Sequence, residues 1–439
     1  PQNTAMLSLF TALYTHQLRY TLNAANEALN SAELYLTLQG LKFKFTGWTE
    51  TLPTLIQSTL ERLPTVADQI TESDFTIQKA LLIKKLKNQE VEILFRRAFL
   101  LLQHILNKYS YVESEIIDAL EGITFSSFSS GIKSLLQEFS VTSLILGDMT
   151  IDQAVNLQTN ITKLLEKNFK LYTDNEADLN CALKTTCGNL NYKSAFLRQM
   201  SKHVGSKDNM ILNYYQLQPG TLKDITILEL INQAFSVRAF ETLRTQKKLG
   251  YVVASRAKTF AGVPGLLVVV QGPLEYPDKL DNEVTDFMAQ FAGYLKGLSD
   301  EDLMILKIGF LSSLVEDLRY PEDKAAFFFS SFEDGFSEFT DITKKIDIIE
   351  KLQKNELIDT YNKLSNTTNH KLSIQMFSPV GLNAVPEDLL KTPQFVNGSK
   401  IEVYTNEIQL KGNLSYYIAE NNRTENIFNN TYPPTLLLQ

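Results

Sequence analysis

The strongest constraint on this chain of 439 residues is an internal repeat whose spacing increases steadily along the sequence. Four short patterns recur at offsets that grow from 220 to 224, 226 and 230 positions. The residues that begin these paired patterns are Leu29 and Leu249, Pro53 and Pro277, Ser73 and Ser299, and Ser143 and Ser373. Such an offset is expected when two copies of one fold differ by short loop insertions, and a period this long excludes a solenoid. The sequence therefore predicts a tandem duplication.

Each copy is predicted to contain a helix, two strands, a helix, a long helix, a further helix and a strand. In the second copy Thr221 and Asp224 have the spacing of a capping box, which marks the start of the first helix. The apolar residues that follow recur at helical spacing and are Ile225, Leu228, Ile231 and Phe235.

Both copies then contain a predicted β-hairpin. The first hairpin covers residues 33–46 with Gly40 at its turn. The second covers residues 251–271 and has a loop that contains Gly262 and Gly265. Helices segregated against hairpin-connected strands are typical of α+β folds. We therefore expect two homologous two-layer α/β domains, each with a mixed, mostly antiparallel sheet packed against helices.

The predicted domains are residues 1–170 and 208–439, joined by a polar linker of residues 171–207. The second copy has a further strand at residues 211–217, before its first helix. The offset puts the matching strand of the first copy upstream of Pro1. We therefore expect the first domain to lack its N-terminal strand and the chain to come from a longer one.

Composition and charge exclude several classes of protein. Hydrophobic residues make up 44% of the chain and charged residues 21%, as in ordinary globular domains. No apolar run approaches the ~20 residues of a membrane span. A net charge of −8 argues against a nucleic-acid-binding body, because phosphate contacts need a basic face. Neither nucleic acid nor a membrane is expected as a partner.

Two cysteines are too few for a disulfide framework. Cys181 and Cys187 lie close together and could pair, although free thiols are favoured. Glycosylation sequons occur at Asn160, Asn366, Asn397, Asn413, Asn422 and Asn429. In an asparagine-rich chain several sequons arise by chance, so the compartment is left open, with a slight preference for the cytoplasm over the secretory route.

The sequence contains no recognisable catalytic centre of its own. The four histidines are His16, His104, His203 and His370. None has a second His or a Cys at metal-ligand spacing, so neither H-x-x-E-H nor H-E-x-x-H occurs. There is also no Walker A loop and no G-x-S-x-G elbow. We therefore expect this segment to hold neither a metal nor another cofactor.

Residues 240–253 read F-E-T-L-R-T-Q-K-K-L-G-Y-V-V. This stretch resembles a motif in the C-terminal half of the insulin-degrading-enzyme-like zinc metallopeptidases, an inverted-zincin family that includes pitrilysin. A glycine-containing loop and a strand that ends at Gln271 follow, as they do in that family. Further similar segments are Tyr214 to Gln216, His370 to Ser373 and Asn23 to Leu29. The similarity covers nearly the whole chain and is most specific over residues 209–272.

The resemblance implies an architecture and a function. Enzymes of this family have four homologous domains in two halves that enclose a chamber, and the zinc motif belongs to the N-terminal half. This chain resembles the third and fourth domains, so it would be the substrate-binding half of a zinc metalloendopeptidase. Its partners would be peptide substrates and the N-terminal catalytic half of the same protein. By itself the segment would be inactive.

The resemblance also implies site residues. Arg244 and Tyr251 match the two family residues that reach the active site across the chamber. Substrate-binding positions are expected at Tyr214, Tyr215, Gly262 and Gly265.

The chemistry of these two residue types suits the implied roles. A tyrosine hydroxyl can donate to the oxygen on which charge develops during peptide hydrolysis, and such a donor is worth roughly 3–4 kcal/mol. An arginine presents a planar set of donors to peptide carbonyls. Gly250 is expected to end the helix between them in the left-handed conformation. The alternative is that Arg244 is a surface cation and Tyr251 a core residue. The first copy has Ala24 and Ser31 at the matching positions, so only the second copy has these two side chains.

The chain departs from the family pattern in two places. Lys248 stands where the family often has Gln, which puts the substrate preference near the site in doubt. Residues 314–323 are mostly acidic, where insulin-degrading members have a basic stretch, so binding of polyanions there is in doubt. A second hypothesis is an inert homologue that acts as a peptide-binding or scaffold module, as the core subunits of respiratory complex III do. Retention of Arg244 and Tyr251 favours the enzyme.

Overall fold

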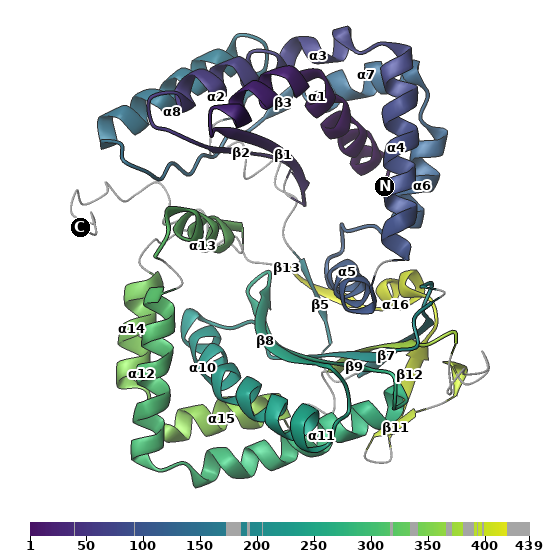
Figure 1. Ribbon diagram of the computed structural model, residues 1–439, viewed down its shortest axis with the longest axis vertical. Helices are drawn as coiled ribbons and strands as arrows, with labels where there is room; N and C mark the ends of the chain where they lie inside the picture. Colours follow the sequence, from purple (N-terminus) through teal and green to yellow (C-terminus); the bar gives the residue numbers. More distant parts are fainter. Residues whose placement is uncertain are drawn as a thin grey trace. The chain divides into compact units, whose positions relative to one another are not determined.

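The computed structural model describes most of the chain and divides it into two compact units (Figure 1). The described residues are 1–38, 40–91, 93–172, 186–190, 194–203, 205–316, 319–333, 341–365, 371–380, 390–392, 394–396 and 399–418. Unit 1 comprises Pro1–Glu90 and Tyr111–Leu183, and unit 2 comprises Val91–Ser110 and Lys184–Gln439. Within the described part of the chain, no helix is both long and apolar enough to cross a bilayer.

Unit 1 is built from a long first helix, a β-hairpin and several shorter helices (Figure 1). Its helices are α1 (Gln2–Glu27), α2 (Leu52–Leu60), α3 (Leu63–Gln69), α4 (Glu72–Glu90), α6 (Glu113–Gly122), α7 (Phe125–Leu135) and α8 (Ile151–Glu166). Its strands are β1 (Ser31–Thr37), β2 (Gly40–Thr46), β3 (Glu138–Phe139) and β4 (Lys170–Leu171). Strands β1 and β2 pair antiparallel, and β3 and β4 pair parallel. The buried face of α1, with Leu9, Phe10 and Leu13, is central to the core.

Unit 2 contains a seven-stranded mixed sheet. Its order is β11 (Gln394–Val396), β12 (Ser399–Tyr404), β6 (Ala195–Met200), β10 (Lys371–Phe377), β7 (Asn209–Gln216), β9 (Val263–Gly272) and β8 (Val252–Phe260). Strand β6 is parallel to both of its neighbours, and the other pairs are antiparallel. Strands β5 (Thr186–Asn189) and β13 (Ser415–Ile418) form a separate antiparallel pair.

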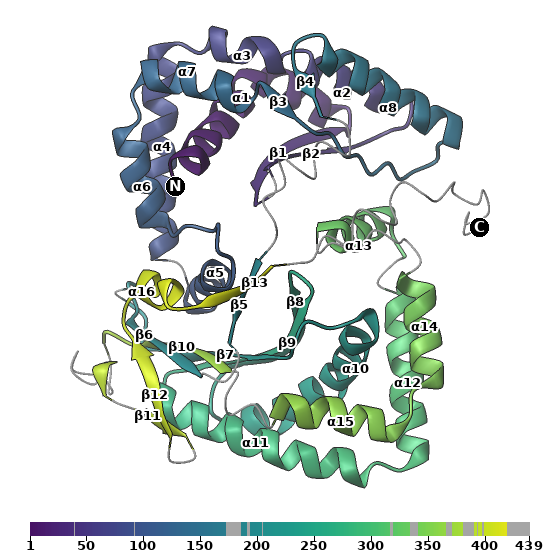
Figure 2. The same cartoon turned by 180° about the vertical axis from the view of Figure 1, so that it is seen from behind.

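The helices of unit 2 cover both faces of this sheet (Figures 1 and 2). They are α5 (Leu94–Leu106), α10 (Leu222–Ala239), α11 (Pro277–Gly297), α12 (Asp300–Glu316), α13 (Pro321–Glu333), α14 (Asp341–Lys351), α15 (Lys354–Ser365) and α16 (Glu407–Gly412). Helices α10, α11 and α15 lie on one face and α5 on the other (Figure 1). Strand β9 is buried along its whole length, which fits the continuous apolar run of its residues 266–270.

The first helix of the second copy begins as the sequence predicts. The Thr221 hydroxyl and backbone N–H both donate to the Asp224 carboxylate at 2.8 Å, which completes the capping box. The predicted apolar positions of α10 are all buried, and Phe235 packs edge-to-face with Phe287 and Phe291 of α11. The mixed α+β class, with a mostly antiparallel sheet packed against helices, is confirmed.

Paired contacts inside the two units support the duplication. In unit 1 the Lys79 Nζ donates to the carbonyl oxygens of Glu121 and Ile123, at 3.2 and 2.8 Å. In unit 2 the Lys307 Nζ donates to the carbonyl oxygens of Glu350 and Leu352, also at 3.2 and 2.8 Å. In each case a lysine of the long helix satisfies carbonyl groups at the end of a later helix, α6 or α14.

The long helices α4 and α12 also begin alike. Thr71 exchanges hydrogen bonds with Asp74 before α4, and Ser299 does the same with Asp302 before α12. The sequence pairing of Ser73 with Ser299 was therefore two residues out of register, because the N-cap of α4 is Thr71. The short motif around Ser73 matched by composition and not by structural role.

The division into units differs from the predicted boundaries in two places. Helix α5, inside the predicted first domain, belongs to unit 2 because its buried side chains contact β5, β7 and β10. Strands β5 and β6 lie inside the predicted linker of residues 171–207. Residues 195–197 in β6 are buried, so this part of the linker contributes to the sheet of unit 2.

Two predicted local structures are wrong. Residues 143–146 form no strand. Their counterpart in unit 2, β10, pairs with β6 and β7, and the described residues of unit 1 contain no counterpart of either strand. The second hairpin also has no long glycine loop. Its turn consists of Ala261 and Gly262, both with positive φ (49° and 78°), as two-residue hairpins require. Gly265 lies inside β9.

Candidate functional site

The predicted catalytic residues lie at the corner where α10, the first helix of the second copy, passes into the β8–β9 hairpin. Helix α10 continues into a π-helix at Phe240–Gln246, a rare form that is frequent at functional sites. Leu243 and Leu249 are buried and anchor the corner, and the Leu249 N–H donates to the Leu243 carbonyl at 3.0 Å. The residues between these two leucines are exposed, so this corner presents its polar side chains to solvent.

The residue that turns the chain here is Lys248, and not Gly250 as the sequence predicted. Lys248 has φ 55°, a left-handed conformation that costs a residue with a side chain about 1–2 kcal/mol. Gly250 serves a different purpose. A Cβ at Gly250 would lie 2.1 Å from the Gln271 carbonyl oxygen, so only glycine allows the chain to pass this close to β9.

Arg244 is exposed on the π-helix. Its guanidinium carbon lies 4.6 Å from the centroid of the Phe240 ring, which is itself partly exposed. A cation held over an aromatic face in this way is stabilised by about 0.5–1 kcal/mol at an exposed site. The stacking restricts the guanidinium plane and leaves its N–H groups available to a ligand.

Tyr251 is 53% exposed and lies directly before β8. Its hydroxyl donates to the Asp208 carboxylate, and the Gln271 side-chain amide donates to the Tyr251 hydroxyl oxygen at 2.8 Å. The same amide donates to the Asp208 Oδ2 at 2.8 Å. The hydrogen bond to Asp208 raises the pKa of Tyr251 above its ordinary value, so the hydroxyl stays protonated near neutral pH and can act as a donor.

The structure puts the predicted substrate-binding residues elsewhere. Tyr214 is fully buried, and its ring covers Gly265, where a Cβ would lie 2.4 Å from the ring. Tyr215 points to the opposite face of β7 and is 5% exposed. Burial raises the pKa of both hydroxyls. Gly262 is at the turn, at the far end of the nine-residue strand β8 from Tyr251. Direct contact of these four residues with a substrate stays a prediction.

Sequence reasoning missed Asp208 and noted Gln271 only as the end of a strand. Both are recognisable from the sheet register. Asp208 precedes β7, Gln271 lies in β9 opposite Val252, and Tyr251 precedes β8. The order β7, β9, β8 therefore brings the three side chains together at one end of the sheet. This pairing of strands is a tertiary property that no local pattern reveals.

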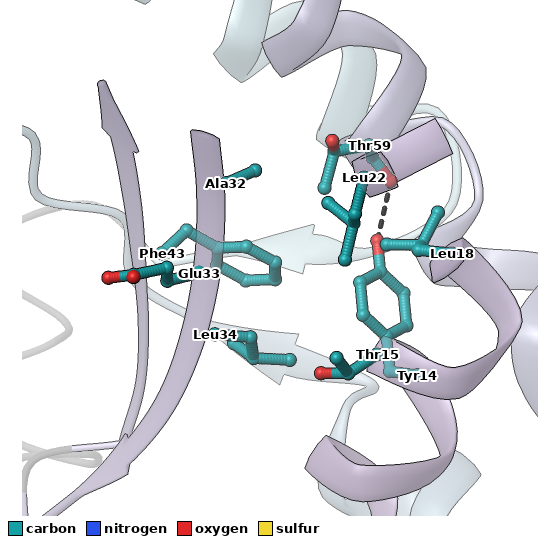
Figure 3. Close-up of a pocket in the computed structure, with 9 residues that line it drawn as sticks. All are labelled: Tyr14, Thr15, Leu18, Leu22, Ala32, Glu33, Leu34, Phe43 and Thr59. Atoms are coloured by element: carbon teal, nitrogen blue, oxygen red, sulfur yellow. Dashed lines mark hydrogen bonds between the residues drawn. The ribbon is translucent and has the colours of Figure 1, made fainter. Parts of the chain in front are cut away.

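A shallow pocket in unit 1 does not qualify as a substrate site. It lies between α1 and the β1–β2 hairpin and is lined mainly by apolar side chains, among them Leu18, Leu34 and Phe43 (Figure 3). Tyr14 also lines the pocket, and its hydroxyl donates to the carbonyl of Thr59 at 2.5 Å (Figure 3). The free volume is about 10 Å³, which is room for about one water molecule.

The described residues do not fit a zinc ion. Over that part of the chain, no group of three or more His, Cys, Asp or Glu side chains could hold a metal. His104 is buried in α5, and burial lowers its pKa to about 3. Cys187 is buried in β5, where burial raises the pKa of its thiol to about 12. Cys181 and His370 lie outside the described residues, so the predicted alternatives for Cys181 are not tested.

Comparisons with known proteins agree with this architecture. The crystal structure of pitrilysin superposes with a TM-score of 0.78 at 17% identity, over 95% of this chain and 42% of that chain. The inactive domain of an M16 peptidase from Pseudomonas fluorescens superposes with a TM-score of 0.57 at 12% identity, over 82% of this chain and 84% of that one. The fold is therefore that of the pitrilysin-like peptidases.

Sequence comparisons point to the M16 peptidases. The middle or third domain of the M16 peptidases matches residues 1–119, and domain 4 of the C-terminal lobe of PQQ synthase PqqF-like proteins matches residues 230–328. The A-factor-processing enzyme of Saccharomyces cerevisiae is 24% identical over 401 residues, which is 90% of this chain and 38% of that protein. The human insulin-degrading enzyme is 24% identical over 307 residues, 69% of this chain and 29% of that protein.

This chain is similar to the M16 peptidases, the family of insulinase and pitrilysin, over most of its length. It spans less than two fifths of the length of these two curated relatives. The two matching models describe a third domain and a domain 4, over residues 1–119 and 230–328 of this chain.

Proposed function

We propose that this chain is the C-terminal, substrate-binding half of a zinc metalloendopeptidase that degrades peptides in an enclosed chamber. In this proposal it supplies Arg244 and Tyr251 to the active site of the N-terminal half. The observation that carries the proposal is the corner between α10 and β8, where a π-helix and a left-handed lysine hold both side chains exposed. Similarity to the M16 peptidases supports it.

Tyr251 acts as a hydrogen-bond donor in this proposal. Peptide hydrolysis places negative charge on the former carbonyl oxygen, and a preorganised neutral donor stabilises that charge without reorganisation. The raised pKa of Tyr251 keeps its proton in place at the pH where peptides are cleaved. The exposed position of the ring leaves room for a substrate carbonyl to approach.

Arg244 binds substrate in this proposal. Its guanidinium offers several N–H donors in one plane, and the stacking on Phe240 limits how that plane can rotate. Such a group contacts a peptide carbonyl both before and during the reaction. We therefore assign Arg244 to binding and turnover together, whereas Tyr251 acts mainly in the transition state.

The metal chemistry is assigned to another part of the protein, because the described residues of this chain do not fit zinc. We expect the 439-residue chain by itself to bind no stoichiometric zinc and to hydrolyse no peptide. Metal analysis of the purified chain and a fluorogenic peptide assay would test both expectations. Stoichiometric zinc together with peptide turnover would contradict them.

An inert, peptide-binding homologue is the second candidate function. It is favoured by the similarity to the Pseudomonas fluorescens structure, which is described as an inactive domain. The exposed Arg244 and Tyr251 are equally suited to hold a peptide without cleaving it. The two candidates differ in turnover by the full-length protein, which the enzyme hypothesis requires and the inert homologue lacks.

The decisive experiment compares two tyrosine variants of the full-length protein. Tyr251→Phe removes one hydroxyl and little packing, so kcat is expected to fall by on the order of 10²-fold while KM changes little. Tyr35→Phe is the matched control, because Tyr35 is also exposed and also donates to a carboxylate, that of Glu33. An unchanged kcat in folded Tyr251→Phe would remove Tyr251 from the mechanism.

A further inference from the structure

We infer that Asp208 and Gln271 are positioning residues that hold the Tyr251 hydroxyl at the site. This inference rests on the proposed function of Tyr251. Its starting point is the closed triangle of hydrogen bonds among the three side chains, which come from the ends of three neighbouring strands.

Tyr251 needs such a holder because its own packing is weak. The side chain is 53% exposed, so few neighbours limit its rotation. A tyrosine that rotates freely has to be ordered again for each catalytic event, which reduces the benefit of a donor. The polar contacts at the tip of the ring are therefore the main restraint on where the hydroxyl oxygen lies.

Gln271 is the rigid member of the triangle. Its side chain is only 7% exposed, and its backbone lies in β9 between β7 and β8. Its Nε2 group donates to both the Tyr251 oxygen and Asp208, each at 2.8 Å. Because Gln271 donates to the phenol oxygen, it fixes that oxygen without using the tyrosine proton.

Asp208 is the member that engages the proton. A carboxylate can only accept, so the single hydroxyl proton of Tyr251 points to Asp208 in this structure. Rotation about the bond between the ring and the oxygen would turn the proton to a substrate while Gln271 keeps the oxygen in place. Asp208 therefore sets the resting orientation, and it has no need to touch the substrate.

The first test is a double-mutant cycle in the full-length protein. Asp208→Ala is expected to lower kcat about tenfold and to change KM less than about twofold, since the hydroxyl keeps its proton but loses one of the two contacts that restrain it. In a Tyr251→Phe background the same change is expected to alter kcat less than about twofold, because its effect passes through the hydroxyl. Asp286→Ala, on the exposed surface of α11, removes the same charge as a control.

A second readout does not depend on activity. Tyrosine labelled with ¹³C at Cζ gives one NMR resonance per ring, and the Tyr251 resonance is the one missing from Tyr251→Phe. Asp208→Asn removes the carboxylate charge at nearly constant size, so the Tyr251 resonance is expected to shift and to titrate at lower pH. Asp286→Asn is expected to leave that resonance unchanged.

The outcomes separate this inference from the proposed function. Normal kinetics of Tyr251→Phe with a shifted resonance in Asp208→Asn would overturn the catalytic role and leave the holder intact. If Asp208→Ala changed kcat equally with Tyr251 and with Tyr251→Phe, the positioning role of Asp208 would be overturned. An increase in kcat in Asp208→Ala would overturn it as well. An unchanged Tyr251 resonance in Asp208→Asn would overturn it as well. A lower melting temperature with unchanged kcat would show that Asp208 is merely structural.

Discussion

The two helix-to-hairpin corners of this protein share a backbone course but use polar side chains in opposite ways. Leu29 in unit 1 and Lys248 in unit 2 are both left-handed, with φ 59° and 55°. In unit 1 the next residue, Asn30, is buried and accepts from the Trp48 N–H at 3.0 Å. In unit 2 the next residue, Leu249, is buried and apolar.

The polar side chain therefore lies inside the corner in unit 1, whereas the polar side chains lie outside the corner in unit 2. Asn30 fills its corner so closely that a Cβ on Gly47 would lie 2.0 Å from the Asn30 Oδ1. In unit 2 an apolar contact closes the corner, and the polar groups gather outside it around Tyr251. A corner that is closed by apolar side chains leaves its polar surface side chains available for a ligand.

The left-handed residues also correct the register of the comparison. Leu29 and Lys248 lie 219 positions apart, whereas the sequence repeat paired Leu29 with Leu249 at an offset of 220. The counterparts of Arg244 and Tyr251 are therefore Ala25 and Ala32, and not Ala24 and Ser31. Neither alanine has a donor group, so the conclusion that only the second copy has these side chains is unchanged.

The largest expected effect comes from Gly250, whose counterpart is Ser31. Gly250→Ala would force a Cβ against the Gln271 carbonyl, so we expect a loss of about 3 kcal/mol in the free energy of unfolding. Ser31→Ala is expected to cost less than about 0.5 kcal/mol. Urea denaturation of both variants measures the difference. Equal costs would mean that the two corners tolerate side chains alike.

A smaller loss is expected for the buried polar group of unit 1. Asn30→Ala removes the acceptor of the Trp48 N–H and the nearer of two acceptors of the Thr51 hydroxyl, at a cost of about 2 kcal/mol. Asn23→Ala, at an exposed position of α1, is the control and is expected to be nearly neutral. Peptide turnover by folded Asn30→Ala is expected to be normal. Loss of turnover at full foldedness would contradict the structural role.

Arg244 distinguishes the functional corner from its counterpart. Arg244→Ala is expected to lower kcat/KM about tenfold, which is about 1.4 kcal/mol, and Arg244→Lys should not restore it because an ammonium lacks the planar donors. The control is Arg238→Ala, since Arg238 also stacks on an aromatic ring, with its guanidinium 3.4 Å from the Tyr294 centroid. Comparable losses of kcat/KM in Arg244→Ala and Arg238→Ala would indicate an effect of positive charge in general and not a specific contact of Arg244.

The smallest effect tests whether the two backbones are equivalent. Glycine adopts the left-handed conformation without strain, so Leu29→Gly and Lys248→Gly are each expected to raise the free energy of unfolding by about 0.5 kcal/mol. Leu29→Ala keeps the strain and is the control. Thermal or urea melts would detect the gains. A gain at one position alone would show that the backbones differ in strain.

Much of the fold could be predicted because its signals are local. The helical spacing after Thr221, the capping box and the two hairpins all depend on residues within one turn or one strand. The duplication was also readable, since two copies of one fold keep the order of such signals. The strand at residues 143–146 was predicted wrongly because a strand exists only where partner strands pair with it.

The candidate site was predictable in part. The motif at residues 240–253 identified Arg244 and Tyr251, and the structure places both at one exposed corner. The same resemblance suggested Tyr214 and Tyr215, which alternate across a fully buried strand. A sequence shows the alternation but not whether both faces of the sheet are covered.

By itself, the sequence determined the duplication, the α+β class and the family resemblance, because these follow from the order of residues along the chain. Only the tertiary structure decided that α5 packs in unit 2 and that Lys248 makes the left-handed turn. It also brought Asp208 to Tyr251 across 43 residues of sequence and Gln271 across 20. The physical reason is that strand pairing joins segments by hydrogen bonds between backbone groups. Every residue has these groups, proline lacking only the N–H, so strand pairing leaves little trace in the sequence.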